Sequence, residues 1–116
     1  KDFSTKKASL LPTLTKKIEN LEHALASTSG YFFVDNEPRA CDFLAYHHLD
    51  VARTLYQNLF LKFPRITKLL KAIESIDPVK NYLETRPKLI DIGVSPKLVI
   101  NGTAHPTGTK NTENLI

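Results

Sequence analysis

Apolar residues recur every three or four positions in the first quarter of the chain, which is the period of an α-helix buried along one side. The stripe is made by Leu11, Leu14, Ile18, Leu21 and Leu25. Pro12 suits the first turn of such a helix, where its missing N–H is tolerated. We expect the residues before it to form a frayed or kinked extension. The run at residues 27–30 ends the helix, with Gly30 suited to a left-handed cap.

A second helical pattern follows a short aromatic run. Residues 31–34, YFFV, are too few for a helix, and we expect an extended piece that places aromatic rings in the core. Pro38 favours a helix start, and the apolar pattern continues to about Tyr56. Apolar residues cover more than half of its circumference between Cys41 and Leu49, so this helix is expected to be central. Its broad apolar face is assigned to Ala40, Phe43, Leu44, His47, Val51 and Leu55.

Two shorter helices follow, and each is introduced by a proline. Pro64 suits the first turn of the third helix. The stripe of that helix is formed by Ile66, Leu69, Leu70 and Ile73. Asp77 and Pro78 are a favoured N-cap and first residue for a fourth helix, which is expected to end near Arg86. The inner side of the fourth helix is formed by Val79, Tyr82 and Leu83.

The pattern changes in the last quarter of the chain, where no helical period remains. Leu98, Val99 and Ile100 precede an Asn-Gly pair, which predicts a strand and a tight turn, and the final residues are turn formers. The chain therefore predicts an all-α fold, a bundle of about four helices with an extended irregular C-terminal tail. We place the helical domain at residues 1–87 and the tail at residues 88–116.

The composition fits one globular domain. A chain of 116 residues buries roughly 65 % of its unfolded surface, which is enough for one modest core. With 41 % hydrophobic and 24 % charged residues, it is too apolar for a disordered chain and too polar for a membrane protein. The single cysteine cannot form an internal disulfide, and the first residues lack the apolar stretch of a signal peptide. A reducing, cytoplasmic location is therefore expected.

The basic residues do not form a nucleic-acid footprint. The chain has 16 basic and 12 acidic residues, a net charge of +4. Lysines form two small pairs, Lys6-Lys7 and Lys16-Lys17, and the other basic residues are scattered. Nucleic-acid binding requires such residues to gather on one face, so we expect neither nucleic acid nor a membrane as a partner.

Reactive side chains crowd into the stretch PRACDFLAYHHLD, which raises the question of a metal or catalytic site. A zinc site on one helix needs two ligands four residues apart, whereas the neighbours His47 and His48 diverge by about 100°. Cys41 lies about two turns from His48, and nothing in the spacing requires the distant His23 or His105. We expect no metal, with His47 at the edge of the core and His48 in water.

The same stretch offers a nucleophile and an acid. Cys41 falls in the first turn of the helix, where a thiol is mildly activated, but a nucleophile also needs a base within reach. No Gly-rich phosphate loop or Ser-His-Asp pattern is present. Asp42 lies where a carboxylate meets free N–H groups and the positive end of the helix dipole. We therefore expect no catalytic residue and interpret Asp42 as an acid that stabilises the helix N-terminus.

Three segments in order resemble the helical second domain of the cytosolic glutathione S-transferases. GYFFVDNEPRACDFLAYHHLD is similar to their central segment, in which an aromatic-Phe-Val-Gly-Asn run precedes a Thr-x-x-Asp-Phe helix start. LKFPRITKLLKAIESIDPVKNYLETRP resembles the continuation, and LLPTLTKKIENLEHAL resembles the long helix before it. The resemblance covers residues 9–87, and its specificity lies in the order and spacing of motifs that are individually weak.

The chain departs from the family pattern at three places. Arg39 stands at the N-cap, where the family has Ser or Thr, and its side chain cannot accept a hydrogen bond, so the reciprocal capping box is broken. Asp35 replaces the glycine before Asn36. By the resemblance, the chain also starts near the family's second helix of this domain, without the thioredoxin-like N-terminal domain.

The resemblance implies a division of labour between the domains. In the family, the thioredoxin-like domain binds glutathione and carries the residue that stabilises its thiolate, so no catalytic residue and no bound cofactor is expected in this segment. Glutathione is expected as the co-substrate of the full-length protein, a likewise cytoplasmic homodimer that detoxifies hydrophobic electrophiles. By the same resemblance, Leu98, Val99 and Ile100 line the substrate pocket, or else they cover the domain's own core or dock on the thioredoxin-like domain.

Helical domains of this type also occur without chemistry. They dock proteins in translation-elongation subunits and in aminoacyl-tRNA synthetase complexes. A non-catalytic protein-interaction module of such an assembly is therefore the alternative function. The uncapped central helix and the lack of a catalytic half motivate this alternative.

Overall fold

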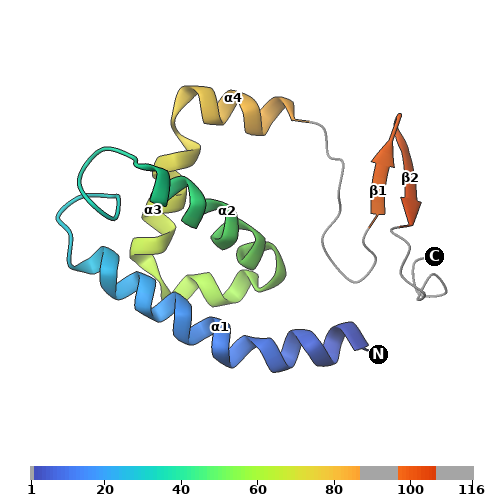
Figure 1. Cartoon of the computed structure of the whole chain (residues 1–116), viewed down its shortest axis with the longest axis horizontal. Helices are drawn as coiled ribbons and strands as arrows, with labels where there is room; N and C mark the ends of the chain where they lie inside the picture. Colours follow the sequence, from blue (N-terminus) through green and yellow to red (C-terminus); the bar gives the residue numbers. More distant parts are fainter. Residues whose placement is uncertain (1, 87–96, 107–116) are drawn as a thin grey trace.

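The computed structural model describes residues 2–86 and 97–106 and confirms the all-α fold (Figure 1). The helices are α1 (Asp2–Ala26), α2 (Ala40–Leu55), α3 (Pro64–Glu74) and α4 (Asp77–Thr85), and a short 3-10 helix, η1 (Gln57–Lys62), joins α2 to α3. Figure 1 shows α1 along one side of the helical bundle and α4 on the opposite side. The four predicted α-helices are all present.

The core is built around α3. α1, α2, η1 and α4 each pack against this helix. Its predicted stripe is fully buried: Ile66, Leu69, Leu70 and Ile73. The other buried apolar residues are Ile18, Leu25, Phe32, Leu49, Ala52, Phe60 and Phe63. The prediction that the second helix would be central is wrong, because α2 keeps apolar side chains in solvent while α3 is covered on several sides.

The buried face of α2 is rotated from the predicted face. Phe43 and Leu44 are 41 % and 63 % exposed, and His47, which was expected at the edge of the core, is exposed as well. Of the predicted face, Val51 and Leu55 are half-buried. The other buried or half-buried residues of this helix are Asp42, Ala45, Tyr46, Leu49, Asp50, Ala52 and Arg53. Asp42 accounts for this rotation. Its side chain turns inward to accept two backbone hydrogen bonds, and this sets the orientation of the whole helix about its axis.

α1 starts nine residues before the first residue of the apolar stripe, and Pro12 lies inside it. An ion pair of 2.8 Å between Asp2 and Lys6 bridges the first turn. The hydroxyl of Tyr56 donates a 2.7 Å hydrogen bond to the carbonyl of Lys7, which ties the early turns to the end of α2. The expectation that this extension is frayed is therefore wrong, because it is helical and has a tertiary contact of its own.

Gly30 follows α1, but it is not a left-handed cap, since its φ angle is not positive. A glycine is needed there for a different reason. A Cβ atom at this position would lie 2.5 Å from the backbone carbonyl oxygen of Asp35 and 2.5 Å from the side-chain oxygen of Asn36. The loop thus folds back onto Gly30 so closely that a side chain cannot fit. Of the aromatic run after it, Phe32 is buried, whereas Tyr31 is 58 % exposed.

Residues 97–106 form an antiparallel hairpin of β1 (Lys97–Ile100) and β2 (Thr103–Pro106). Asn101 and Gly102 connect the strands with φ angles of 49° and 77°. Two positive φ angles are what a type I′ turn requires, and Asn-Gly is its favoured pair. The predicted strand and tight turn are confirmed, so this part of the tail is regular and not irregular as expected.

Candidate binding groove

α1 and α2 both pack on α3 and leave a groove of about 450 Å³ beside them. Eight of its lining residues are apolar: Leu14, Ile18, Leu21, Phe33, Leu44, Ala45, Leu49 and Ala52. Lys17, Cys41 and His48 are its polar lining residues. A concave surface of this size with mostly apolar walls and a few polar groups is typical of a site for an apolar ligand.

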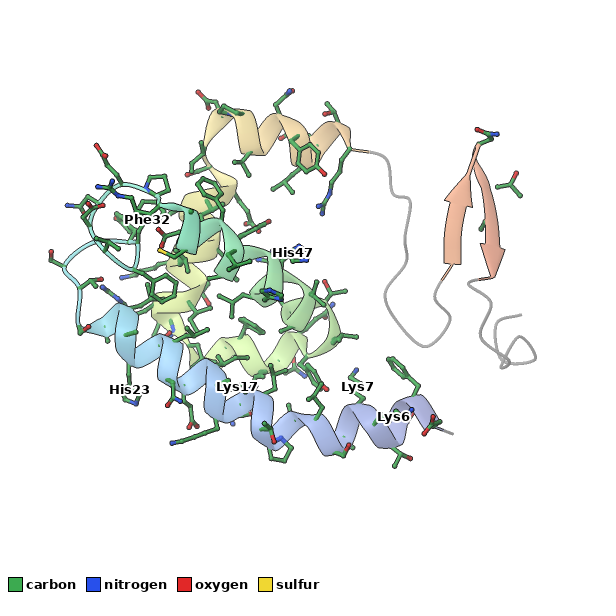
Figure 2. The ribbon with its side chains drawn as sticks, in the orientation of Figure 1. Lys6, Lys7, Lys17, His23, Phe32 and His47 are labelled. Carbon is green, nitrogen blue, oxygen red and sulfur yellow. The ribbon has the colours of Figure 1, made fainter. Side chains whose placement is uncertain are left out.

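Cys41 and His48 are the reactive side chains that line the groove. Cys41 is exposed, and its Sγ lies 3.8 Å from a carboxylate oxygen of Asp42, to which the thiol can donate a hydrogen bond. Within the described part of the chain, no three of the His, Cys, Asp and Glu residues are grouped as a metal site requires. Figure 2 shows His23 and His47 projecting from different helices. The groove can therefore bind a ligand by shape and apolar contact.

Asp42 fixes the end of the groove at which α2 begins. Its carboxylate is fully buried and accepts hydrogen bonds from the backbone N–H of Phe33 at 2.9 Å and of Arg39 at 2.8 Å. The Arg39 bond is the half of a capping box that the N3 acid supplies. The Arg39 side chain makes no cap and pairs with Asp35 at 2.7 Å instead. Asp42 thus holds Phe33, a groove residue, against the first turn of α2.

The pair of Glu22 and Arg65 fixes α1 to the start of α3. The two oxygens of Glu22 accept the backbone N–H groups of Arg65 and Ile66, each at 2.9 Å. In return, the Arg65 guanidinium donates to the carbonyls of Leu25 and Thr28 at 2.7 Å and of Gly30 at 3.0 Å. Each helix therefore satisfies the free backbone groups at the other's end, which sets the position of the α1 wall.

A polar cluster fixes the other wall by joining α2 to α3. Arg53 donates to Asp50 at 2.6 Å and to Glu74 at 2.5 Å, and the hydroxyl of Tyr46 donates to Glu74 at 3.2 Å. Burial, with the charges of Asp50 and Glu74, raises the pKa of Tyr46 to about 12. Burial alone would lower the pKa of Arg53, but its bonds to Glu74 and Asp50 outweigh burial and raise that pKa.

The comparison with known protein families finds a match over most of the chain. The family model described as the glutathione S-transferase C-terminal domain matches residues 1–86. The chain belongs to this family. No curated protein and no solved structure matches the chain. In the described residues of this glutathione S-transferase domain, no helix is long and apolar enough to cross a membrane.

The three residues predicted to line a substrate pocket lie on β1, outside the residues that the family model matches. In the register of the hairpin, Leu98 faces His105, Val99 faces Ala104 and Ile100 faces Thr103. Their side chains lie outside the described part of the structure, as does that of His105. Their place in a pocket therefore stays a prediction.

The sequence indicated only one wall of the groove. Leu14, Ile18 and Leu21 belong to the stripe identified by its period, whereas on the α2 wall only Leu44 belongs to the face predicted for that helix. The Glu22–Arg65 pair was missed entirely, because a side chain that caps a helix more than forty residues away leaves no local spacing signal. The one local hint is a basic residue, Arg65, directly after the proline that starts α3.

Proposed function

We propose that this chain is the helical substrate-binding portion of a glutathione transferase that conjugates glutathione to hydrophobic electrophiles. Membership of the family and the apolar groove between α1 and α2 support the proposal. The groove offers an apolar electrophile a surface from which water is displaced, which favours binding by roughly 25 cal/mol per Å² of apolar area buried. That apolar groove is the single observation that carries the proposal.

The chemistry is assigned to a thioredoxin-like domain of the same enzyme. That domain would bind glutathione and stabilise its thiolate, which attacks the electrophilic carbon while the leaving group departs with the bonding electron pair. The helical domain, residues 1–87, would position the electrophile. The tail, residues 88–116, would add a second wall through Leu98, Val99 and Ile100. The proposal includes a cytoplasmic homodimer with a detoxifying role.

The first test compares the 116-residue chain alone with a protein that also carries its thioredoxin-like domain. A chromogenic aryl halide and glutathione serve as substrates, and formation of the thioether is followed by absorbance. We expect turnover by the two-domain protein and none above the uncatalysed rate by the chain alone. Turnover by the isolated chain would overturn the assigned division of labour.

The second test probes the groove with two matched substitutions in the two-domain protein. Leu44 lines the groove and is 63 % exposed, while Leu61 lies outside it and is 83 % exposed. Because both side chains already contact water, Leu44→Glu and Leu61→Glu leave the fold intact. We expect Leu44→Glu to raise KM for the electrophile roughly tenfold, since a charge opposes apolar burial, with KM for glutathione unchanged. An equal effect of both substitutions would remove the groove from the substrate site.

The same measurements separate this function from the interaction module considered as the alternative. A two-domain protein without turnover and without retention on immobilised glutathione, but recovered together with translation factors, would favour the alternative. Retention on immobilised glutathione with turnover favours the transferase. Family membership alone does not decide between the two, and the outcome rests on these two readouts.

A further inference from the structure

A second hollow, of about 600 Å³, lies where the N-terminal half of α1 passes the junction of α2 and η1. It shares no lining residue with the groove between α1 and α2. Lys7 and Leu11 contribute from α1, and Leu55, Tyr56, Leu59 and Lys62 contribute from the junction. Its volume falls in the range of about 300–1,000 Å³ that is typical of small-molecule sites.

The hollow is positively charged. Lys7 and Lys62 both line it, and none of its described lining residues is acidic. Across residues 2–86 and 97–106, the ion pairs use other cations, so neither of these two ammonium groups is neutralised by a carboxylate. Two uncompensated cations at one hollow favour a ligand with two negative charges.

Lys7 is held at the hollow by Tyr56. Its Nζ lies 5.3 Å from the centre of the Tyr56 ring, within the range of a cation–π contact. The Tyr56 hydroxyl donates to the Lys7 carbonyl at 2.7 Å, so the ring and the lysine are fixed to each other at both ends. Figure 2 shows Lys7 on the part of α1 nearest to its N-terminus, well apart from Lys17 at the groove. The ammonium group therefore has a defined place before any ligand arrives.

The rest of the hollow is apolar enough to select the organic part of the ligand. Leu11, Leu55 and Leu59 supply three isobutyl groups, and Leu11 is 36 % exposed in the free protein. Burying such surface under a ligand is favourable. We propose that this hollow binds a phosphate monoester of an apolar alcohol, whose ester carries about two negative charges at neutral pH. Lysine is a common phosphate binder that acts as a point charge.

Calorimetric titration of the 116-residue chain with 1-naphthyl phosphate tests the proposal. We expect saturable binding at one site, weakened by added salt because the contact is ionic. Lys7→Gln and Lys62→Gln should each weaken binding roughly two- to fivefold, and the double variant roughly tenfold. Lys7→Gln keeps the backbone carbonyl that Tyr56 uses. Lys80→Gln, which removes the same charge outside the hollow, is the matched control and should bind like the parent.

Two comparison ligands test the stated chemistry. The monoanion 1-naphthalenesulfonate and neutral 1-naphthol share the ring but lack the second or both charges, and we expect them to bind several-fold more weakly. Equal affinity for all three, or no loss in the Lys7/Lys62 double variant, would overturn the proposal. So would the absence of saturable binding of 1-naphthyl phosphate.

The phosphate ester could be a dissolved compound or a lipid headgroup, and a third arm separates the two sources. Vesicles that contain phosphatidic acid are sedimented with the chain, and the Lys7/Lys62 double variant is compared with the parent. Co-sedimentation that needs both lysines assigns the ester to a membrane, and binding of dissolved ester alone assigns it to a soluble compound. Because this hollow is separate from the groove, its test does not depend on transferase activity.

Discussion

Replacing Asp42 by Asn tests whether one buried carboxylate sets the structure around the start of α2. Both of its oxygens accept a backbone N–H, one from Phe33 and one from Arg39, and the side chain is fully buried. The Asn side chain keeps one acceptor oxygen, but its NH₂ group would face the second N–H donor. One charge-assisted hydrogen bond is thus lost and one buried donor is left without an acceptor.

The expected cost follows from these two losses. A hydrogen bond to a charged group contributes about 1.5–3 kcal/mol, and an unsatisfied buried donor costs about 1–3 kcal/mol. Because the two estimates partly overlap, we expect a loss of roughly 3 kcal/mol in the free energy of unfolding. That is a large fraction of the roughly 5–15 kcal/mol that stabilises a domain of ordinary stability.

Urea unfolding of the 116-residue chain, followed by far-ultraviolet circular dichroism, measures this loss as a lower midpoint at an unchanged slope. Asp35→Asn is the matched control. It makes the same chemical change in the neighbouring loop, where the carboxylate is exposed to solvent, and it should leave the midpoint nearly unchanged. If Asp42→Asn unfolds within about 0.5 kcal/mol of the parent, the two backbone bonds do not stabilise the loop as argued.

Three further predictions concern other contacts. Glu22→Gln should lower the free energy of unfolding by about 1–2 kcal/mol, because one of the two N–H groups at the start of α3 loses its acceptor. Glu19→Gln, on the same helix, is the control and should have little effect. Urea unfolding measures the stability of both variants. Gly30→Ala should lower the free energy of unfolding by about 1–3 kcal/mol, measured by thermal unfolding, since its Cβ would lie 2.5 Å from a backbone oxygen. Unchanged stability would show that the loop can move away from the new methyl group. Tyr46 should ionise with a pKa of about 12, which a titration of phenolate absorbance measures. Its phenol stays protonated in the folded chain after it ionises in the unfolded chain near pH 10, so stability falls as pH rises above about 10; Tyr46→Phe should remove that part of the decline.

Helix content and the hairpin could be predicted because each leaves a local signal. The three- and four-residue period marked α3, and proline at the first turn marked its start. Asn101-Gly102 marked the turn, because few other residues adopt two successive positive φ angles at low cost. These signals concern residues that are close together in the chain, so the sequence displays them directly.

The centre of the bundle and the face of α2 could not be predicted, because both depend on contacts between distant residues. Phe43 and Leu44 have the apolar character of core residues, yet Asp42 turns the helix so that they meet solvent. The preference of a buried carboxylate for two N–H donors outweighed the apolar pattern. The groove was missed for the same reason, since its second wall is defined only after that rotation.

The mutual capping of α1 and α3 has a consequence for how the chain folds. Arg65 gathers three carbonyls beyond the end of α1, while Glu22 holds the first amides of α3. Neither helix end has all of its backbone hydrogen-bond partners until the other helix is in place, so we expect the two ends to become ordered together. A fragment that stops before Arg65 should therefore have a loosely wound last turn in its long helix, and a longer fragment should acquire both termini together.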